Sequence, residues 1–220
     1  MKILITAGPT REPLDPVRFI SNRSSGRMGY ALALAAVERG HEVVLVSGPV
    51  ELSAPSGVAV VRVTTAQEMH EAVRARIKDQ HVGIFAAAVA DYRPVRMEEQ
   101  KIKKGASRMT LELEKTPDIL GSARSVFGFK GVLIGFAAET ENLVANATQK
   151  MTRKMCDLVV ANHVGGPDSA FDSDMNEITI CTPQLPPQPF RRETKVEVAR
   201  LIVERAEEMA VRKFGKTTPS

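Results

Sequence analysis

The chain has 220 residues, of which 43% are hydrophobic and 25% are charged. The length leaves room for one α/β domain or at most two small ones, and these proportions are near the globular average, which excludes wholesale disorder. Lysine and arginine total 30 against 26 aspartate and glutamate residues, and the net charge of +4 does not by itself indicate a nucleic-acid partner. The sequence holds no apolar run of the roughly 20 residues that span a bilayer, so we expect no membrane segment.

Cysteine use and the first residues bear on where the protein works. Cys156 and Cys181 are the two cysteines and show no CxxC spacing, so we expect neither a disulfide framework nor a zinc site. Residues 1–10 carry one lysine and then a short apolar stretch, unlike a signal peptide. A cytoplasmic protein is the expectation.

Alternating strands and helices are predicted for the first 90 residues. Apolar residues between Met28 and Ala36 recur at helical spacing, and Thr65 with Glu68 has the spacing of a capping box. Strands separated by such helices favour a parallel sheet with right-handed crossovers. Short apolar runs bounded by turn residues predict these strands at Lys2–Thr6, Glu42–Val46, Val58–Val63 and Val82–Ala88.

The middle of the chain combines a basic arm with further regular elements. Residues 91–116 include KIKK (101–104) and MTLELE (109–114). The alternation in MTLELE predicts a half-exposed strand, and the segment as a whole is interpreted as a flexible arm or flap. Helices are then predicted at 117–126 and 141–155, and buried strands at 131–137 and 157–161.

The last part of the sequence predicts a hairpin and a long helix. Ile178–Cys181 precedes the proline-rich residues 183–189, which indicates a β-hairpin with a long loop because proline cannot donate to a ladder. Residues 194–197 have capping-box spacing and open the final helix. We expect a single domain over 1–212 and a flexible tail over 213–220.

The loop after the first strand carries a candidate anion site. Ser24-Ser25-Gly26 leads into the helix that contains Met28. A helix N-terminus with small residues presents free backbone N–H groups to a phosphate, although an ordinary helix cap is the alternative. Arg18 and Asn22 in the same loop offer groups that bind carboxylate, phosphate or amide, although stabilisation of the loop itself is the alternative.

Two further segments suit a nucleoside triphosphate. Residues 86–90 (AAAVA) are small enough to admit a flat ring, although tight packing of these residues is the alternative. Asp91 could bind ribose hydroxyls or a metal. KIKK and a second cluster around Lys150 and Lys154, which share a helix face, supply positive charge. Two basic clusters suit a triphosphate better than the diphosphate of a dinucleotide, although any single lysine could be solubilising charge.

Six segments together resemble phosphopantothenoylcysteine synthetase (phosphopantothenate–cysteine ligase) of the bacterial, CTP-dependent type, and the similarity runs from about residue 2 to 210. The resemblance implies a Rossmann-like three-layer α/β fold with a mostly parallel sheet, and a homodimer. Family members are usually fused behind a flavin-dependent decarboxylase domain, so such a domain or partner is implied, with no flavin in this chain. The segments are AGPTREPLDPVRFISNRSSGRMG (7–29), AAAVADYRP (86–94), KIKK (101–104), KTPDIL (115–120), GFAAET (135–140) and DLVVAN (157–162).

The resemblance implies a two-step ligation in coenzyme A biosynthesis. The carboxylate of 4′-phosphopantothenate attacks the α-phosphate of CTP and releases pyrophosphate, and the amine of L-cysteine then opens the acyl-cytidylate and releases CMP. Because the first step brings anions together, cations and Mg²⁺ or Mn²⁺ must offset the repulsion. No protein nucleophile is required, and the sequence shows no GxSxG motif or Cys/His pair that would supply one.

The motifs of the family assign roles to residues of this sequence, with the metal ligands unassigned. Lys101 would stabilise the α-phosphate, Asn22 would hold the acyl-cytidylate and Arg18 would support that loop. Substrate or phosphate would bind at Ser24, Ser25, Gly26 and Met28. The positions that match the CTP site are Ala86, Ala87, Ala88, Asp91, Lys101, Pro117, Asp118, Ile119, Leu120, Phe136, Lys150 and Lys154.

Two stretches depart from the pattern of the family, and two other functions stay open. The family commonly reads AND and then SDNN, where this chain has His163 and Met175 at the departing positions, so neither is placed in the site. An NAD(P)-dependent reductase would share the fold, but the sequence lacks a GxGxxG fingerprint and a Tyr-x-x-x-Lys pair. A non-catalytic nucleotide-binding module would bind CTP without releasing pyrophosphate.

Overall fold

A mostly parallel sheet forms the centre of the protein. The structure is a computed structural model that describes residues 1–105, 107–164 and 174–215. The sheet has eight strands in the order β13-β12-β10-β9-β6-β1-β4-β5, and antiparallel β12 (Ile178–Cys181) and β13 (Gln188–Pro189) complete one edge. The remaining strands pair in parallel: β1 (Lys2–Ala7), β4 (Glu42–Ser47), β5 (Val58–Arg62), β6 (Val82–Phe85), β9 (Val132–Glu139) and β10 (Leu158–His163).

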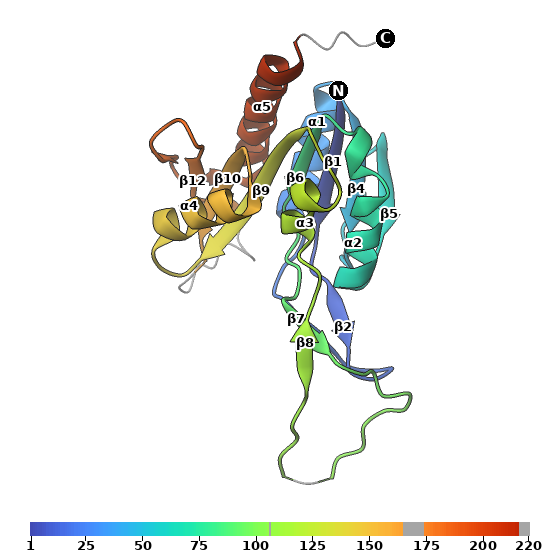
Figure 1. Cartoon of the computed structure of the whole chain (residues 1–220). Coiled ribbons are helices and arrows are strands. Elements are labelled where there is room, and N and C mark those ends of the chain that lie inside the picture. The colour runs from blue at the N-terminus through green and yellow to red at the C-terminus, as the bar shows by residue number, and fades with distance from the viewer. Residues whose placement is uncertain (106, 165–173, 216–220) are drawn as a thin grey trace.

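Helices cover both faces of this sheet, which confirms the three-layer α/β fold (Figure 1). Ile3 and Ile5 of β1 share one apolar core with residues of α1 (Arg27–Glu38) and α5 (Lys195–Phe214). Leu4, between them in sequence, belongs to the opposite core, which includes residues of α2 (Ala66–Arg74), α3 (Ile119–Ser125) and α4 (Leu143–Lys154). Successive strand residues point to opposite faces, so uninterrupted apolar runs are what a sheet covered on both sides requires.

The predicted elements are confirmed with changes at their ends. β6 ends at Phe85, three residues before the predicted end of that strand, and a one-turn helix η1 (Ile77–Asp79) follows α2. The hydroxyl of Thr65 accepts the N–H of Glu68 at 3.1 Å, but the Glu68 carboxylate bonds the N–H of Thr64, one residue before the cap. The full capping box expected at residues 194–197 is present at the start of α5.

The C-terminal hairpin forms as predicted, but its second strand lies inside the proline-rich segment. Ile180 pairs with Gln188, and Thr179 pairs with Pro189, which is the last residue of β13 at the edge of the sheet. Proline tolerates this position because an edge strand needs to donate on one side alone. A short ladder of β11 (Met175–Asn176) and β14 (Glu193–Thr194) leads into α5.

The basic arm extends away from the sheet from a base of two small hairpins (Figure 1). β7 (Tyr92–Pro94) pairs with β8 (Leu113–Lys115). The half-exposed strand predicted at 109–114 is wrong in extent, because strand structure begins at Leu113 and all three residues of β8 are exposed. A neighbouring hairpin of β2 (Arg11–Pro13) and β3 (Phe19–Ser21) was not predicted, since three residues are too few to show a period.

The tail predicted from residue 213 begins too early. Lys213 and Phe214 belong to α5. The Nζ of Lys213 donates to the carbonyl oxygen of Gly131 at 3.1 Å, and the ring of Phe214 packs edge-on against His81. These contacts extend the helix, whereas residues 216–220 of the expected tail lie outside the described residues. No helix in the described ranges is long and apolar enough to cross a membrane.

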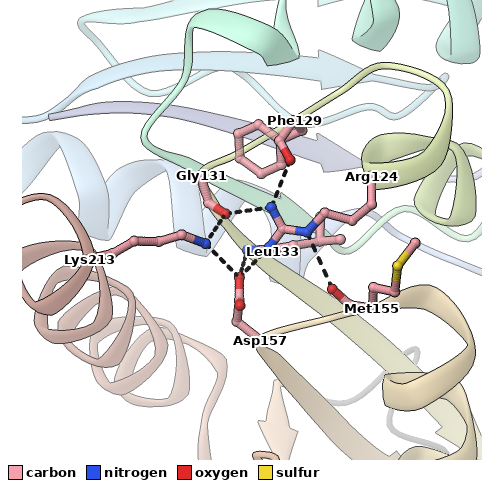
Figure 2. A network of polar contacts seen from close by, with 7 residues as sticks. All are labelled: Arg124, Phe129, Gly131, Leu133, Met155, Asp157 and Lys213. Carbon is pink, nitrogen blue, oxygen red and sulfur yellow. Dashed lines mark hydrogen bonds and ion pairs between the residues drawn. The ribbon is translucent and has the colours of Figure 1, made fainter.

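A polar network around Arg124 fixes the edge of the sheet where β9 and β10 begin (Figure 2). The guanidinium of Arg124, on α3, donates to the carbonyl oxygens of Phe129 and Gly131 at 2.8 Å and to the Asp157 carboxylate at 2.5 Å. Asp157 also accepts the N–H of Leu133 at 2.8 Å and lies 3.8 Å from Lys213. One guanidinium therefore connects α3, the start of β9, the start of β10 and, through Asp157, the end of α5.

We expect Arg124→Met to lower the free energy of unfolding by about 2 kcal/mol, because the Phe129 carbonyl oxygen loses its donor and the Asp157 carboxylate and Gly131 carbonyl oxygen each lose one of theirs. Urea unfolding followed by circular dichroism measures the change. The control is Arg205→Met, which removes an exposed ion pair with Glu208 and should cost less than about 0.5 kcal/mol. Equal effects of the two substitutions would contradict the role given to the network.

Candidate functional site

Two adjoining cavities lie where the parallel strands end. The first, of about 520 Å³, is lined by the start of α3, the end of α4 and the segment after β6. The second, of about 450 Å³, is lined by the start of α1, the ends of β9 and β10, and the start of α5. The residues that line both are Ala87, Val89, Asp91, Phe136 and Lys150. This shared wall means that groups bound in the two cavities would be neighbours.

The first cavity brings together most of the residues predicted to bind CTP. Lys154 and the segment from Pro117 to Leu120 join the shared wall there. The N–H of Gly121 donates to the Asp118 carboxylate, which caps α3, and Lys154 forms an ion pair with the same carboxylate. Burial would raise the pKa of Asp118, but the bonds from Lys154 and Gly121 outweigh it and hold the pKa below its usual value. The lysine cation therefore has a carboxylate counter-ion when no ligand is bound.

Lys150 is the cation common to both cavities. Its Nζ donates to the carbonyl oxygen of Phe136 at 2.6 Å. Burial lowers the pKa of Lys150, and the nearby Glu139 carboxylate opposes that shift. The Lys150 ammonium is partly buried and lines both cavities. Because the local dielectric is low, it would attract a phosphate group strongly.

The second cavity contains the predicted anion site at the start of α1. Gly26 precedes the helix with φ 77°, and no side chain caps the helix. A Cβ at Gly26 would meet Val50 Cγ1 at 2.7 Å, so glycine is required here for space as well as for conformation. Ser24, Ser25 and Met28 line the same cavity, together with Ala86 and Ala88. The residues predicted to bind the substrate phosphate and those predicted to admit a flat ring thus line the same cavity.

The position of Asn22 is compatible with both roles that the sequence left open. Its Nδ2 donates to the carbonyl oxygens of Ala88 at 3.3 Å and Val89 at 2.9 Å, so it fastens its loop to the segment that follows β6. Asn22 also lines the second cavity. The side chain can therefore shape the loop and meet a ligand.

Three buried polar residues of the second cavity were missed by the sequence analysis. Asn162 is 8% exposed, Asn176 is 4% exposed and Lys195 is 7% exposed, and all three line the cavity. The Oδ1 of Asn176 is buried without a hydrogen-bond partner, and a bound ligand or water in the cavity would supply one. For Asn162 and Asn176 the available signal was their position in the AND-like and SDNN-like stretches, whereas Lys195 lies in neither. Beside Asn162, the departing residue His163 bonds the carbonyl oxygen of Thr140 at 2.9 Å.

Lys101 and Arg18 are not brought to these cavities. Both line a separate cavity of about 750 Å³ that is formed by residues of the arm. The arm extends away from the sheet (Figure 1), and at its base it is bonded to the loop around Arg18, whose Nη2 donates to the carbonyl oxygen of Ile102 at 2.6 Å. The predicted catalytic lysine is thus held apart from the predicted CTP residues in this conformation.

Carboxylates near the first cavity bear on the unassigned metal. Within the described ranges, no group of three or more histidine, cysteine, aspartate or glutamate residues could hold a metal ion. Asp91 and Asp118 are the carboxylates that line the first cavity. Mg²⁺ typically uses one or two protein carboxylates and takes its other ligands from phosphates and water, so this donor set suits a metal that arrives with a nucleotide.

Comparison with known proteins places the chain in a family. The family described as the DNA/pantothenate metabolism flavoprotein C-terminal domain matches residues 1–209. The coenzyme A biosynthesis bifunctional protein CoaBC of Escherichia coli (strain K12) is 49% identical over 181 residues, which is 81% of this chain and 45% of that protein. A cysteine/cysteine sulfinic acid decarboxylase from an unknown prokaryotic organism is 43% identical over 92% of this chain and 56% of its own length.

A solved structure agrees with the fold. The crystal structure of the C-terminal domain of CoaBC is 44% identical, has a TM-score of 0.81, and is covered over 94% of both chains. The chain spans about half the length of the curated relatives that it matches. From the family match and this structural similarity, the chain belongs to the family of DNA/pantothenate metabolism flavoprotein C-terminal domains.

Proposed function

We propose that this protein is a phosphopantothenate–cysteine ligase of coenzyme A biosynthesis that uses CTP. The observation that carries the proposal is the wall of Asp91, Phe136 and Lys150 between two cavities, one suited to a triphosphate and one with a helix N-terminus suited to a substrate phosphate. Relatives named for coenzyme A biosynthesis support it. Those relatives are bifunctional and about twice as long as this chain. By analogy, the second activity would belong to a flavin-dependent decarboxylase domain or partner.

The first step forms an anhydride. The phosphopantothenate carboxylate, held near the shared wall, attacks the α-phosphate of CTP, and the bond to pyrophosphate breaks. Lys150 and Lys154 face the phosphate groups, and Phe136 lies against the base. The triphosphate competes with Asp118 for Lys154. When CTP binds, a phosphate group therefore replaces the Asp118 carboxylate as the counter-ion of Lys154.

The second step forms the amide. The neutral amine of cysteine attacks the acyl carbonyl, the bond to CMP breaks, and the amine loses a proton. Asn22 exchanges its longer bond, to the Ala88 carbonyl oxygen at 3.3 Å, for one to the acyl carbonyl oxygen, where negative charge develops. Lys195 and the N–H groups at the start of α1 hold the phosphate of the pantothenate moiety at the far end of the second cavity.

Mg²⁺, or Mn²⁺, would neutralise the triphosphate when bound. Asp91 lines both cavities, and Asp118 becomes available when Lys154 turns to the nucleotide. These two carboxylates are therefore the residues that we assign to the metal.

We further propose a cytoplasmic homodimer in which the arm is covered. Several exposed apolar side chains lie on the arm and its hairpins, and a contiguous exposed apolar surface is typical of an interaction site. These side chains are Val17, Phe19, Tyr92, Val95, Met97, Met109, Leu111 and Leu113. Lys101 stabilises the α-phosphate once the arm carries it to a nucleotide, and Arg18 supports the loop of Asn22.

One assay tests the function. The protein is incubated with phosphopantothenate, L-cysteine and Mg²⁺ together with either CTP or ATP, and pyrophosphate and the ligated product are measured. We expect pyrophosphate release that requires phosphopantothenate and is faster with CTP. Binding of CTP without pyrophosphate would instead show a nucleotide-binding module. Release of CO₂ from cysteine or its sulfinate, or oxidation of NAD(P)H, would assign the chain to another reaction.

Asn22→Asp should separate the two steps. The new carboxylate cannot donate to the acyl carbonyl and is repelled by the carbonyl oxygens of Ala88 and Val89, so the second step should stall. Mass spectrometry of the reaction should then show acyl-cytidylate, with pyrophosphate release continuing. Gln184→Glu, a similar change at an exposed loop residue, is the control and should give the normal product. Normal product alone from Asn22→Asp would remove that residue from the second step.

Lys150→Met should weaken CTP binding roughly tenfold, because a hydrogen bond to a charged group contributes about 1.5 kcal/mol. A bound triphosphate raises the lowered pKa of Lys150, so CTP binding takes up a proton and weakens as the pH rises through the pKa of the free protein. Calorimetry in buffers of different ionisation enthalpy measures this uptake, which the variant should lose. Exposed Lys78 supplies the control, Lys78→Met. Undiminished uptake by Lys150→Met would contradict the assignment.

A further inference from the structure

Asp15 is buried at the base of the arm and accepts five hydrogen bonds. Its Oδ1 accepts the N–H groups of Val17 at 2.8 Å and Arg18 at 2.9 Å. Its Oδ2 accepts Nε of Arg18 at 2.9 Å, Nη2 of Arg18 at 2.6 Å and the N–H of Ile102 at 3.1 Å. A carboxylate has about four lone-pair sites, so this one is saturated.

Two of these contacts join segments that are far apart in sequence. Ile102 lies 87 residues from Asp15 and stands directly after Lys101. Arg18 bonds the same residue from its other side, through the Ile102 carbonyl oxygen. The N–H of Glu98 adds a bond to the carbonyl oxygen of Leu14 at 2.9 Å. The loop 14–18 and the start of KIKK therefore form one bonded unit.

The charge of Asp15 is permanent at working pH. Burial would raise the pKa of this carboxyl, but Arg18 and the N–H groups of Val17 and Ile102 hold it well below its ordinary value. A turn alone would need just the Val17 and Arg18 N–H groups. The bond to Ile102 adds nothing to that turn, but it fixes the place of the arm.

We propose that Asp15 is a positioning residue that holds Lys101 and Arg18 in one rigid unit, so that the arm presents both cations to the nucleotide together. The inference rests on the proposed function, in which Lys101 acts on the α-phosphate. Misplacement of a reacting group by about 1 Å can cost roughly a hundredfold in rate. A lysine on a loop without regular structure therefore needs such an anchor.

The test combines arm mobility with turnover in the full chain. Thr110, an exposed polar residue of the arm, is replaced by cysteine for a fluorescent label. Labelling is selective because Cys156 and Cys181 are buried, and burial raises the pKa of both thiols, that of Cys156 to about 12. Asp15→Asn removes the charge, whereas Ile102→Pro removes the N–H on the arm and leaves the Asp15–Arg18 pair intact, which guards against a folding defect. Asp79→Asn, at an exposed aspartate, is the control.

We expect both variants to lower the label's anisotropy and to reduce pyrophosphate release at least about tenfold, with the dissociation constant for CTP within about twofold of the parent. Unchanged anisotropy and turnover in both variants would overturn the proposal, as would an equal loss in Asp79→Asn. Lys101→Gln separates the two ideas. Normal release by that variant would refute the role of Lys101 in the proposed function, while the anisotropy would still decide whether Asp15 anchors the arm.

Discussion

The common direction of four central strands determines where this protein can hold a ligand. β10, β9, β6 and β1 are neighbours and run parallel, so the segments that leave them emerge at one edge. Residues at the ends of β9 and β10 and directly after β6 line one cavity together with the start of α1. Ligands of open α/β sheets bind at this edge for the same reason. The opposite edge, where the Arg124 network lies, carries stability instead.

Two cations of the first cavity already have partners. Lys150 bonds a backbone carbonyl oxygen and Lys154 pairs with Asp118. A ligand therefore enters a site whose charges are held in place, and little reorganisation is needed when phosphate replaces these partners. Such preorganisation is the usual source of electrostatic stabilisation in enzymes. The hydrogen bond to the Phe136 carbonyl oxygen also compensates the Lys150 ammonium for part of the hydration that it loses in the wall between the cavities.

Those parts of the fold that depend on local patterns were predictable from the sequence. Apolar runs identified the buried strands, and the spacing of Lys150 and Lys154 predicted the shared helix face from which both line the first cavity. The parts that depend on short segments or distant contacts were not predictable. The β2–β3 hairpin has no period to detect, and the position of Lys101 depends on the bond between Asp15 and Ile102, which no local pattern contains. In the sequence, Lys195 has only the features of an ordinary residue in the first turn of a helix, and its place at the second cavity depends on the fold.

The proline at the outer edge of the sheet limits how copies of this chain can associate. β13 consists of two residues, and one of them, Pro189, lacks an N–H. A strand from another molecule would find almost no ladder to extend on that side. Continuous sheets across subunits are thereby discouraged at this border, which protects the protein against edge-to-edge aggregation during synthesis and leaves association to side-chain packing elsewhere.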